Sequence, residues 1–311
     1  MAKHRHELAF LTLAVYHHPV LRVLFALLWV GSLASCGSAT VEPKVEHEAR
    51  LLSPIPACAA VLPSPAPGVQ VALRKEYWTI VFPAFDAAQG RLPADALACT
   101  GAALLQDGAF SESRVVDRLT DEQITMGGGA DGIKAVWLRS HLISENGAAG
   151  ALALVRTKGE FAYVIAVGVH RGRIDARLSL DRLGSDIVLL VREEGCKGDK
   201  KGPCQSLLSV YLVRQGKLSL GTRLALEQMA FGDGETLGEE GQVFHLTASP
   251  SFVDRELRVM ERVRVLDRLG RVVRWAELER VFIEVGDVLE PSDDPLWTQM
   301  TRRIQRRNRG R

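Results

Sequence analysis

The feature that most constrains the fold is a regular succession of short apolar segments in the second half of the chain, separated by turn residues. The segments fall at 151–155, 161–169, 187–191, 207–213, 218–226, 243–246 and 257–266. Runs of this length, bounded by Gly, Asn, Asp or Pro, are typical of β-strands joined by short turns. The second half of the chain is therefore predicted to form β-sheet.

The last of these segments indicates how the sheet is exposed to water. Its apolar residues are Leu257, Val259, Val263 and Val265, and they alternate with Arg258, Arg262 and Arg264. Successive side chains of a strand point to opposite faces, so one face is predicted to be buried and the other solvated. Glu261 is the exception on the apolar face. This alternation is typical of an antiparallel sheet, and we expect a mainly β fold with some α, in a sandwich or barrel-like arrangement.

An export signal precedes this part of the chain. The apolar run at 23–30 follows Arg22 and ends in small residues, which is typical of a secretory signal peptide and not of a membrane span. The tetrapeptide Leu33-Ala34-Ser35-Cys36 closes it and resembles the lipobox of bacterial lipoproteins. The resemblance covers the export segment alone. It implies cleavage before Cys36, lipidation of that cysteine, and attachment to a membrane of the cell envelope. The alternative is an ordinary signal cleaved nearby, with Cys36 left as a thiol.

A proline-rich segment follows the lipobox. Residues 37–68 contain six prolines and few aromatic residues, a composition that favours an extended tether over a packed core. The expected organisation is a signal peptide at 1–35, a lipidated tether at 36–68, a mixed α/β subdomain at 69–145, an antiparallel β domain at 146–290 and a basic tail at 291–311. Gly37 is not acidic, which within the lipoprotein class is compatible with transfer to the outer membrane.

The remaining cysteines form an even set in an exported chain. Disulfides are the default in an oxidising compartment, and we predict the pairs Cys58 with Cys99 and Cys196 with Cys204. The second pair brackets a polar, turn-rich loop and would hold the tip of a hairpin. A metal site is the competing interpretation, but no CxxC spacing supports it.

The C-terminus is strongly basic. The last ten residues include Arg302, Arg303, Arg306, Arg307, Arg309 and Arg311, whereas the rest of the mature chain has more acidic than basic residues. Arginine matches the geometry of phosphate and carboxylate groups, so the first five of these are candidate anion-binding residues for headgroups or wall carboxylates. A solvated terminus is the alternative. Nucleic acid is an unsuitable partner for a chain that is otherwise acidic and exported.

Three segments of the first half carry local predictions. The run at 77–82 is aromatic and β-branched and ends at Pro83, which favours a buried strand, and 92–99 favours a short helix with Pro93 near its start. The glycines at 127–132 match GxGxxG, but a strand-like segment follows them where a nucleotide site needs a helix, so a turn is the better interpretation. Segment 275–283 fits either helix or strand.

The sequence contains few residues in patterns typical of catalytic or metal-binding sites. It has no GxSxG, HExxH or EF-hand motif after the signal, and His47, His141, His170 and His245 lie far apart. The pairs Glu193-Glu194 and Glu239-Glu240 lie beside glycines and are predicted to be solvated. We expect no cofactor or metal. The hypothesis is an anchored envelope protein with a binding or structural role, whose partner is an envelope protein, glycan or anionic lipid. The alternative is an envelope hydrolase whose site assembles only in three dimensions.

Overall fold

The computed structural model describes residues 56–62, 75–129, 132–196, 203–233 and 240–301. The chain divides into two compact units, Met1–Arg50 and Leu51–Arg311, and every described element belongs to the second. The predicted signal peptide, the lipidation site at Cys36 and the arginines from Arg302 onward lie outside the described residues. Within the described residues, no helix has the length and apolar character needed to span a bilayer.

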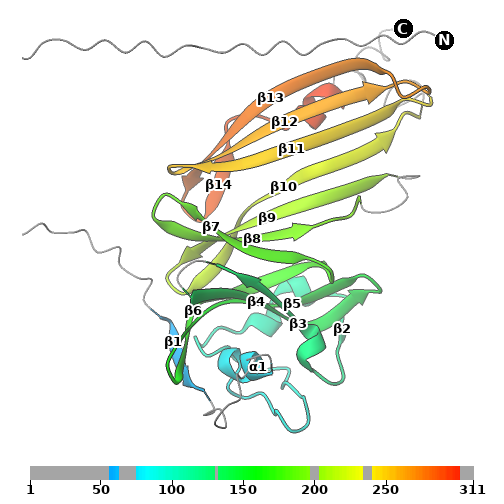
Figure 1. The fold of residues 1–311 in the computed structure, drawn as a ribbon. Helices are drawn as coiled ribbons and strands as arrows, with labels where there is room; N and C mark the ends of the chain where they lie inside the picture. Colours follow the sequence, from blue (N-terminus) through cyan, green and yellow to red (C-terminus); the bar gives the residue numbers. More distant parts are fainter. Residues whose placement is uncertain (1–55, 63–74, 130–131, 197–202, 234–239, 302–311) are drawn as a thin grey trace, which may run out of the picture. The chain divides into compact units, whose positions relative to one another are not determined.

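The predicted fold class is confirmed, because a large open sheet of mainly antiparallel strands dominates the structure (Figure 1). Its first part contains β1 (Cys58–Val61), β2 (Arg114–Val115), β3 (Ile124–Gly128), β4 (Ile133–Ser144), β5 (Gly147–Lys158) and β6 (Phe161–Arg173). Strands β4, β5 and β6 pair in sequence order, while β2 and β3 pair with β4 and β1 pairs with β6. Strands β4 and β5 lie on either side of the turn at 145–146 and pair with each other.

The second part of the sheet contains the remaining strands. They are β7 (Arg177–Leu183), β8 (Asp186–Glu193), β9 (Cys204–Arg214), β10 (Lys217–Phe231), β11 (Val243–Val253), β12 (Glu256–Leu266), β13 (Val272–Val285) and β14 (Val288–Pro291). Each pairs antiparallel with the next in sequence. The two parts meet at a single parallel pair, Lys217 with Val167. They are otherwise joined by packing.

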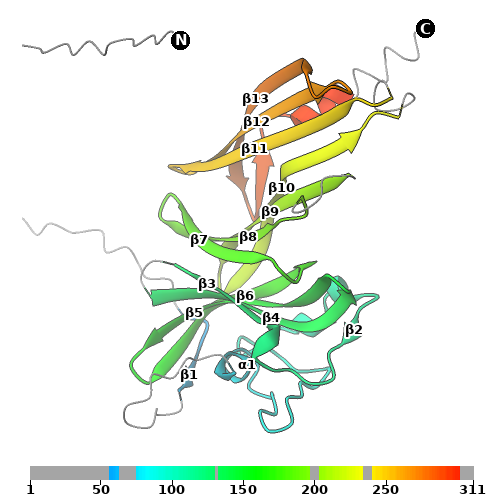
Figure 2. The ribbon, with the colours of Figure 1, turned by 45° about the vertical axis from the view of Figure 1, so that its right-hand side comes forward.

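Apolar clusters lie on both sides of the sheet. One packs α1 (Glu76–Val81) and the loops around η1 (Leu104–Gln106), η2 (Gly108–Phe110) and η3 (Asp121–Gln123) against β4, β5 and β6. A second fills the space between β4–β6 and β7–β9 and includes Trp137 and Tyr211. A third lies among β8–β10 and β12–β14, and the fourth seats the helical residues 296–301 on β11 and β12. Figure 2 shows the two parts of the sheet crossing.

Two local predictions in the first half are wrong. The run at 77–82 is buried as expected but forms helix α1, not a strand, and its Phe82 amide donates to the Trp78 carbonyl. Tyr77, Trp78 and Val81 are fully buried and Thr79 is exposed, and in an apolar run this short periodicity alone does not distinguish a helix from a strand. Segment 92–99 has turns and no helix. Its chain is held by the Cys99 amide, which donates to the Val81 carbonyl.

The glycine-rich segment has a packing role that the sequence did not indicate. Gly127 and Gly128 belong to β3, and β3 crosses β7 at close range. A Cβ atom at Gly127 would lie 2.1 Å from the Leu178 carbonyl oxygen, and one at Gly129 would lie 2.3 Å from the Leu180 side chain. Glycine is required here because the two strands approach too closely for any side chain.

Other predictions for the second half are confirmed. Segment 257–266 lies in β12, with Leu257, Val259 and Val263 buried, Arg262 and Arg264 exposed, and Arg258 half-buried. The ambiguous segment at 275–283 is strand, within β13. Both predicted disulfides are present, and Cys196–Cys204 joins the ends of β8 and β9 while Cys58–Cys99 ties β1 to the loop that follows α1.

Candidate functional site

A concave site lies where β10 and β11 separate. The two strands pair only from Glu227 with Thr247 to Phe231 with Val243. Before Glu227, β10 continues beside β9, and after Thr247, β11 continues beside β12. The strands therefore diverge like a fork whose apex is the Glu227–Thr247 pair.

Divergence leaves one edge of β11 without a strand partner. Residues 248–253 pair with β12 on one side, and no described strand pairs with them on the side that faces β10. The far end of the fork is closed where the Gly184 amide, in the β7–β8 turn, donates to the Asp254 carbonyl in the β11–β12 turn. Pro250 lies within this edge and has no N–H, which is the usual position of proline in a sheet.

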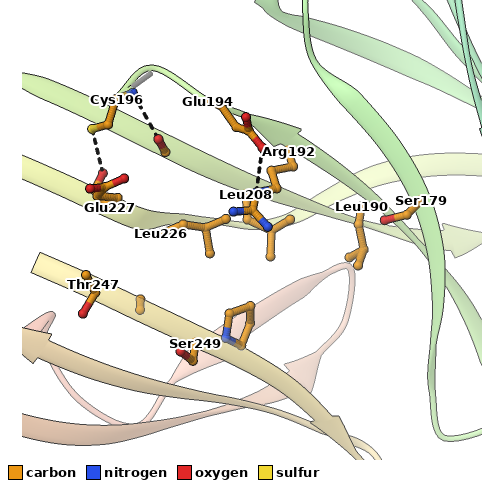
Figure 3. A pocket seen from close by; sticks show the side chains of 13 residues that line it. Ser179, Leu190, Arg192, Glu194, Cys196, Leu208, Leu226, Glu227, Thr247 and Ser249 are labelled. Atoms are coloured by element: carbon orange, nitrogen blue, oxygen red, sulfur yellow. Dashed lines mark hydrogen bonds and ion pairs between the residues drawn. The ribbon is translucent and has the colours of Figure 1, made fainter. Parts of the chain in front are cut away.

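A groove of about 770 Å³ occupies the fork near its apex (Figure 3). We call it the fork groove. Its lining comes from β7, β8, β9, β10 and β11 and comprises Ser179, Leu190, Arg192, Glu194, Cys196, Ser206, Leu208, Leu226, Glu227, Thr247, Ala248, Ser249 and Pro250. Four consecutive residues of β11 are included, 247–250, so the groove meets that strand at its edge and not at one face.

The apex of the groove is polar. Ser206, Glu227 and Thr247 lie side by side on β9, β10 and β11. The Glu227 carboxylate accepts a hydrogen bond of 3.0 Å from Nε2 of His245, which lies on the same face of β11 as Thr247. The Ser206 hydroxyl accepts from the Cys196 amide at 3.2 Å. The disulfide thus holds the end of β8 against the apex.

Charge and apolar surface are arranged along the groove. Glu194 is mostly buried and lies 3.6 Å from both Arg192 and Arg177, distances that give charge pairing without a short hydrogen bond. Beyond Arg192 the wall is formed by Leu190, Leu208 and Leu226, of which the last two are buried. The groove therefore combines carboxylates at one end with leucines further along.

A buried polar network occupies the opposite face of the same strands. His170 Nδ1 shares a hydrogen bond of 2.8 Å with the Tyr211 hydroxyl. The Glu193 carboxylate accepts from Arg223 Nη2 at 2.7 Å and from the Arg173 amide at 3.0 Å, and it lies 3.8 Å from His170 Nε2. His170, Glu193 and Tyr211 are almost completely inaccessible to solvent. The network links β6 to β8, β9 and β10.

Burial determines the protonation states in this network. Desolvation, with a smaller effect from the Arg223 cation, lowers the pKa of His170 to about 3. Burial also raises the pKa of Tyr211 well above its ordinary value, and the Glu193 carboxylate adds to that effect while Arg223 opposes it. A neutral imidazole and a neutral phenol therefore face the contact between Glu193 and Arg223. The arrangement is suited to fixing strands and not to contacting a substrate.

The prediction that Glu193 and Glu194 are both solvated is wrong. Glu193 has 4% of its surface exposed and is paired with Arg223, and Glu194 is mostly buried beside the groove. The two side chains do point to opposite faces, as strand geometry requires. The prediction assumed that both side chains at the end of β8 face solvent, whereas each is covered by neighbouring strands. Glu240 is exposed, and Glu239 lies outside the described residues.

The histidines are not brought together. Nδ1 of His141 lies 2.8 Å from the Ser140 hydroxyl, and burial lowers the pKa of His141. His170 is in the buried network, and His245 lies at the groove apex. His47 lies outside the described residues. In the described part of the chain, no histidine contacts both a serine hydroxyl and a carboxylate, and no three potential metal ligands gather.

Of the groove residues, the sequence had singled out Cys196, which was assigned to a disulfide, and Glu194, which was predicted to be solvated. Glu227, Arg192 and the leucines carry no motif, because they come from three strands, β8, β9 and β10, and are brought together by sheet register. A bulge between Ala225 and Glu227 also makes the lining hard to predict, because it changes which side chains of β10 face the groove. No family model, curated protein or solved structure matches the chain.

Proposed function

We propose that this chain is a lipid-anchored protein of the cell envelope that binds a ligand in the fork groove. The support for the anchor is the signal sequence that ends in Leu33-Ala34-Ser35-Cys36. The observation that carries the binding role is the lining of the groove, in which Glu194 and Glu227 lie at one end and Leu190, Leu208 and Leu226 continue from them. Concave sites with a mainly apolar wall and a few convergent polar groups are the usual form of a ligand site.

The lining favours an extended peptide that contains a basic residue. Glu194 lies 3.6 Å from both Arg192 and Arg177, so a cation is favoured at the apex of the groove, where Glu227 lies beside His245. None of the described lining residues is aromatic, which disfavours a glycan because sugars bind by stacking on rings. The unpaired edge at 248–253 offers backbone acceptors to the amides of an extended chain. Leucine side chains would then take up the apolar residues of the peptide.

A hydrolase is the weaker candidate. Its best support is the His245–Glu227 pair at the apex, which has the composition of a base and its orienting carboxylate. A hydrolytic nucleophile would have to lie within hydrogen-bond reach of His245, and none of the described side chains does so apart from Glu227. The Ser206 hydroxyl instead accepts from the Cys196 amide.

Peptide binding tests the role of the groove. Isothermal titration would compare the acetylated peptide amide Leu-Lys-Leu-Lys-Leu with Leu-Glu-Leu-Glu-Leu, using wild type, Glu227→Gln and the control Glu256→Gln. Glu256 is a half-exposed glutamate on β12 outside the groove. We expect saturable binding of the lysine peptide alone, weakened about tenfold by Glu227→Gln because a charge-assisted contact is lost. Equal binding of both peptides, or equal effects of the two substitutions, would contradict the proposal.

Cys36→Ala tests the anchor separately. We expect the variant to keep its signal peptide, to migrate as a larger product and to lose incorporation of a labelled fatty acid. A variant with unchanged size and unchanged lipid label would show that another residue is processed, while leaving the groove hypothesis intact.

A further inference from the structure

The tip of the β12–β13 hairpin has an unusual surface that the groove does not involve. We define it as residues 264–275. Within it, Leu269, Val272, Val273 and Trp275 have 76%, 50%, 54% and 63% of their surface exposed. Together these four side chains form an apolar patch on the surface, and such patches often mark a binding surface.

The exposure follows from the sheet. Strand β14 pairs with β13 only over Phe282–Val285, and Ser292 bonds the backbone of Val281, so among the described residues no strand pairs with β13 on that side at 272–280. The register between β12 and β13 jumps from Val265 with Arg274 to Leu266 with Val272, which makes Val273 an extra residue on β13. Such a bulge twists the strand and redirects its side chains. Both faces of β13 are therefore exposed at 272–275.

Arginines surround these apolar side chains. Arg264, Arg268, Arg271 and Arg274 are all exposed. Asp267 is the acidic residue within the tip and is paired with Arg271. Arg264 and Arg274 have no carboxylate partner among the described residues. Arg264 lies directly across from Trp275, and the two line a hollow of about 360 Å³ with Arg262, Val272 and Glu277.

The C-terminal helical residues lie at the same end of the sheet. Leu296 and Met300 pack against Phe244, Val263 and Val265, and Val265 pairs with Arg274 of the tip. The sequence that follows Thr301 begins with Arg302 and Arg303. In Figure 1 this hairpin lies at the end of the sheet opposite α1. Two arginine-rich parts of the chain are thus connected to one end of the sheet.

We infer that the β12–β13 tip binds an anionic membrane surface, with Leu269 and Trp275 entering the interface and Arg264 and Arg274 contacting lipid phosphates. Tryptophan is suited to the headgroup region because its ring is amphipathic, and basic residues near it are attracted by anionic lipid. A second copy of the chain is the poorer occupant, since pairing two tips would bring like charges together. The inference is independent of the fork groove and of Cys36.

Vesicle flotation tests this surface without the lipid anchor. The fragment of residues 51–311 lacks Cys36 and contains every described element, all the apolar clusters and both disulfides. We expect it to float with vesicles of phosphatidylcholine and phosphatidylglycerol in equal parts, and not with phosphatidylcholine alone. Added salt should weaken the binding, because exposed charges are screened. Equal binding to both vesicle types, or none to either, would overturn the inference.

Matched substitutions separate the tip from the rest of the surface. Arg264→Gln with Arg274→Gln should weaken vesicle binding about thirtyfold, and Leu269→Ser about tenfold. The controls Arg114→Gln and Leu97→Ser alter an exposed arginine and a half-exposed leucine far from the tip in the sequence, and should have no effect. Tip variants that bind like wild type would overturn the inference. Near-ultraviolet circular dichroism would verify that each variant is folded.

Two further measurements distinguish the tip from the basic tail. Trp275 fluorescence should shift to shorter wavelength on anionic vesicles, and most of the shift should be lost in Trp275→Phe, because Trp78 and Trp137 are already buried and Trp297 is half-buried against Phe244. A chain that ends at Thr301 should bind more weakly but should still respond to Leu269→Ser. If that truncation abolished binding while the tip variants retained it, the basic tail alone would be responsible and the tip would have no role.

Discussion

Nδ1 of His170 on β6 and the hydroxyl of Tyr211 on β9 lie 2.8 Å apart, and both side chains are buried. This contact crosses the place where the two parts of the sheet meet. Only one β pair, Lys217 with Val167, joins the parts through strand register. The hydrogen bond, together with the Glu193–Arg223 ion pair and the apolar cluster around Trp137, therefore fixes how they cross.

The first prediction concerns the pH dependence of stability. The folded-state pKa of His170 is about 3, below the ordinary value of 6.5, so the unfolded chain binds a proton that the folded chain does not. Stability from this residue is fully present above about pH 6.5 and decreases as pH falls toward 3, by at most about 1.4 kcal/mol per pH unit. Urea unfolding of wild type and His170→Gln between pH 7 and about pH 4 should show a smaller slope in the variant. Parallel curves would contradict this.

The second prediction concerns Gly172. A Cβ atom there would lie 2.5 Å from His170 Nε2 and 2.8 Å from the Glu193 carboxylate. Gly172→Ala should therefore displace the network and destabilise the fold by roughly 2–3 kcal/mol, as overpacking of a buried site does. Gly108→Ala is the matched control, because nothing lies within 4 Å of its Cβ position and its φ is not positive. Thermal unfolding of both variants measures the difference, and equal values would show that the network adjusts freely.

Much of the sheet was predictable, and the reasons are local. Segments such as 257–266 alternate between apolar and polar residues, with Met260 and Glu261 as exceptions, because one face of β12 is covered and the other is not. The Cys196–Cys204 disulfide was predictable because few residues separate its cysteines and a turn-rich loop lies between them.

The features that the sequence did not predict depend on contacts between residues that lie far apart in the chain. Helix α1 was mistaken for a strand because most of its six residues are apolar and buried, and periodicity in so short a run does not distinguish a helix from a strand. Glu193 was mistaken for a solvated residue because its partner Arg223 is 30 residues away. The fork groove has no motif, since it exists only where β10 and β11 separate.

The third prediction compares the two disulfides. Cys58–Cys99 closes a separation of 41 residues and Cys196–Cys204 one of 8. In the chain-entropy model their removal should destabilise the fold by about 4 and about 2.5 kcal/mol, respectively. Chemical denaturation of Cys58→Ser with Cys99→Ser, and of Cys196→Ser with Cys204→Ser, measures both. Removal of the shorter link should also weaken peptide binding, because Cys196 lines the fork groove. A larger loss of stability from the shorter link would contradict the model.

The fourth prediction concerns an ion pair inside the second part of the sheet. Glu261 and Arg280 lie on the covered faces of β12 and β13, with side chains that are 5% and 6% exposed, and are joined by a contact of 2.6 Å. The same carboxylate accepts from the Leu296 amide at 2.7 Å, and Arg280 Nε donates to the Asp293 carbonyl at 3.0 Å. The pair therefore fastens the chain at 293–296, from which the last helical residues begin.

Removing one partner should be more harmful than removing both. Arg280→Met leaves a buried carboxylate without its cation and should destabilise the fold by roughly 3–5 kcal/mol, whereas adding Glu261→Leu should recover part of that loss. The neighbouring pair of Arg262 and Glu277 faces solvent on the other side of the same two strands, so Arg262→Met should change stability by less than about 1 kcal/mol. Urea unfolding of the four variants, including Glu261→Leu alone, completes the cycle. Strictly additive effects would show that the two side chains act independently, and the chain at 293–296 would then have to be held by its backbone contacts alone.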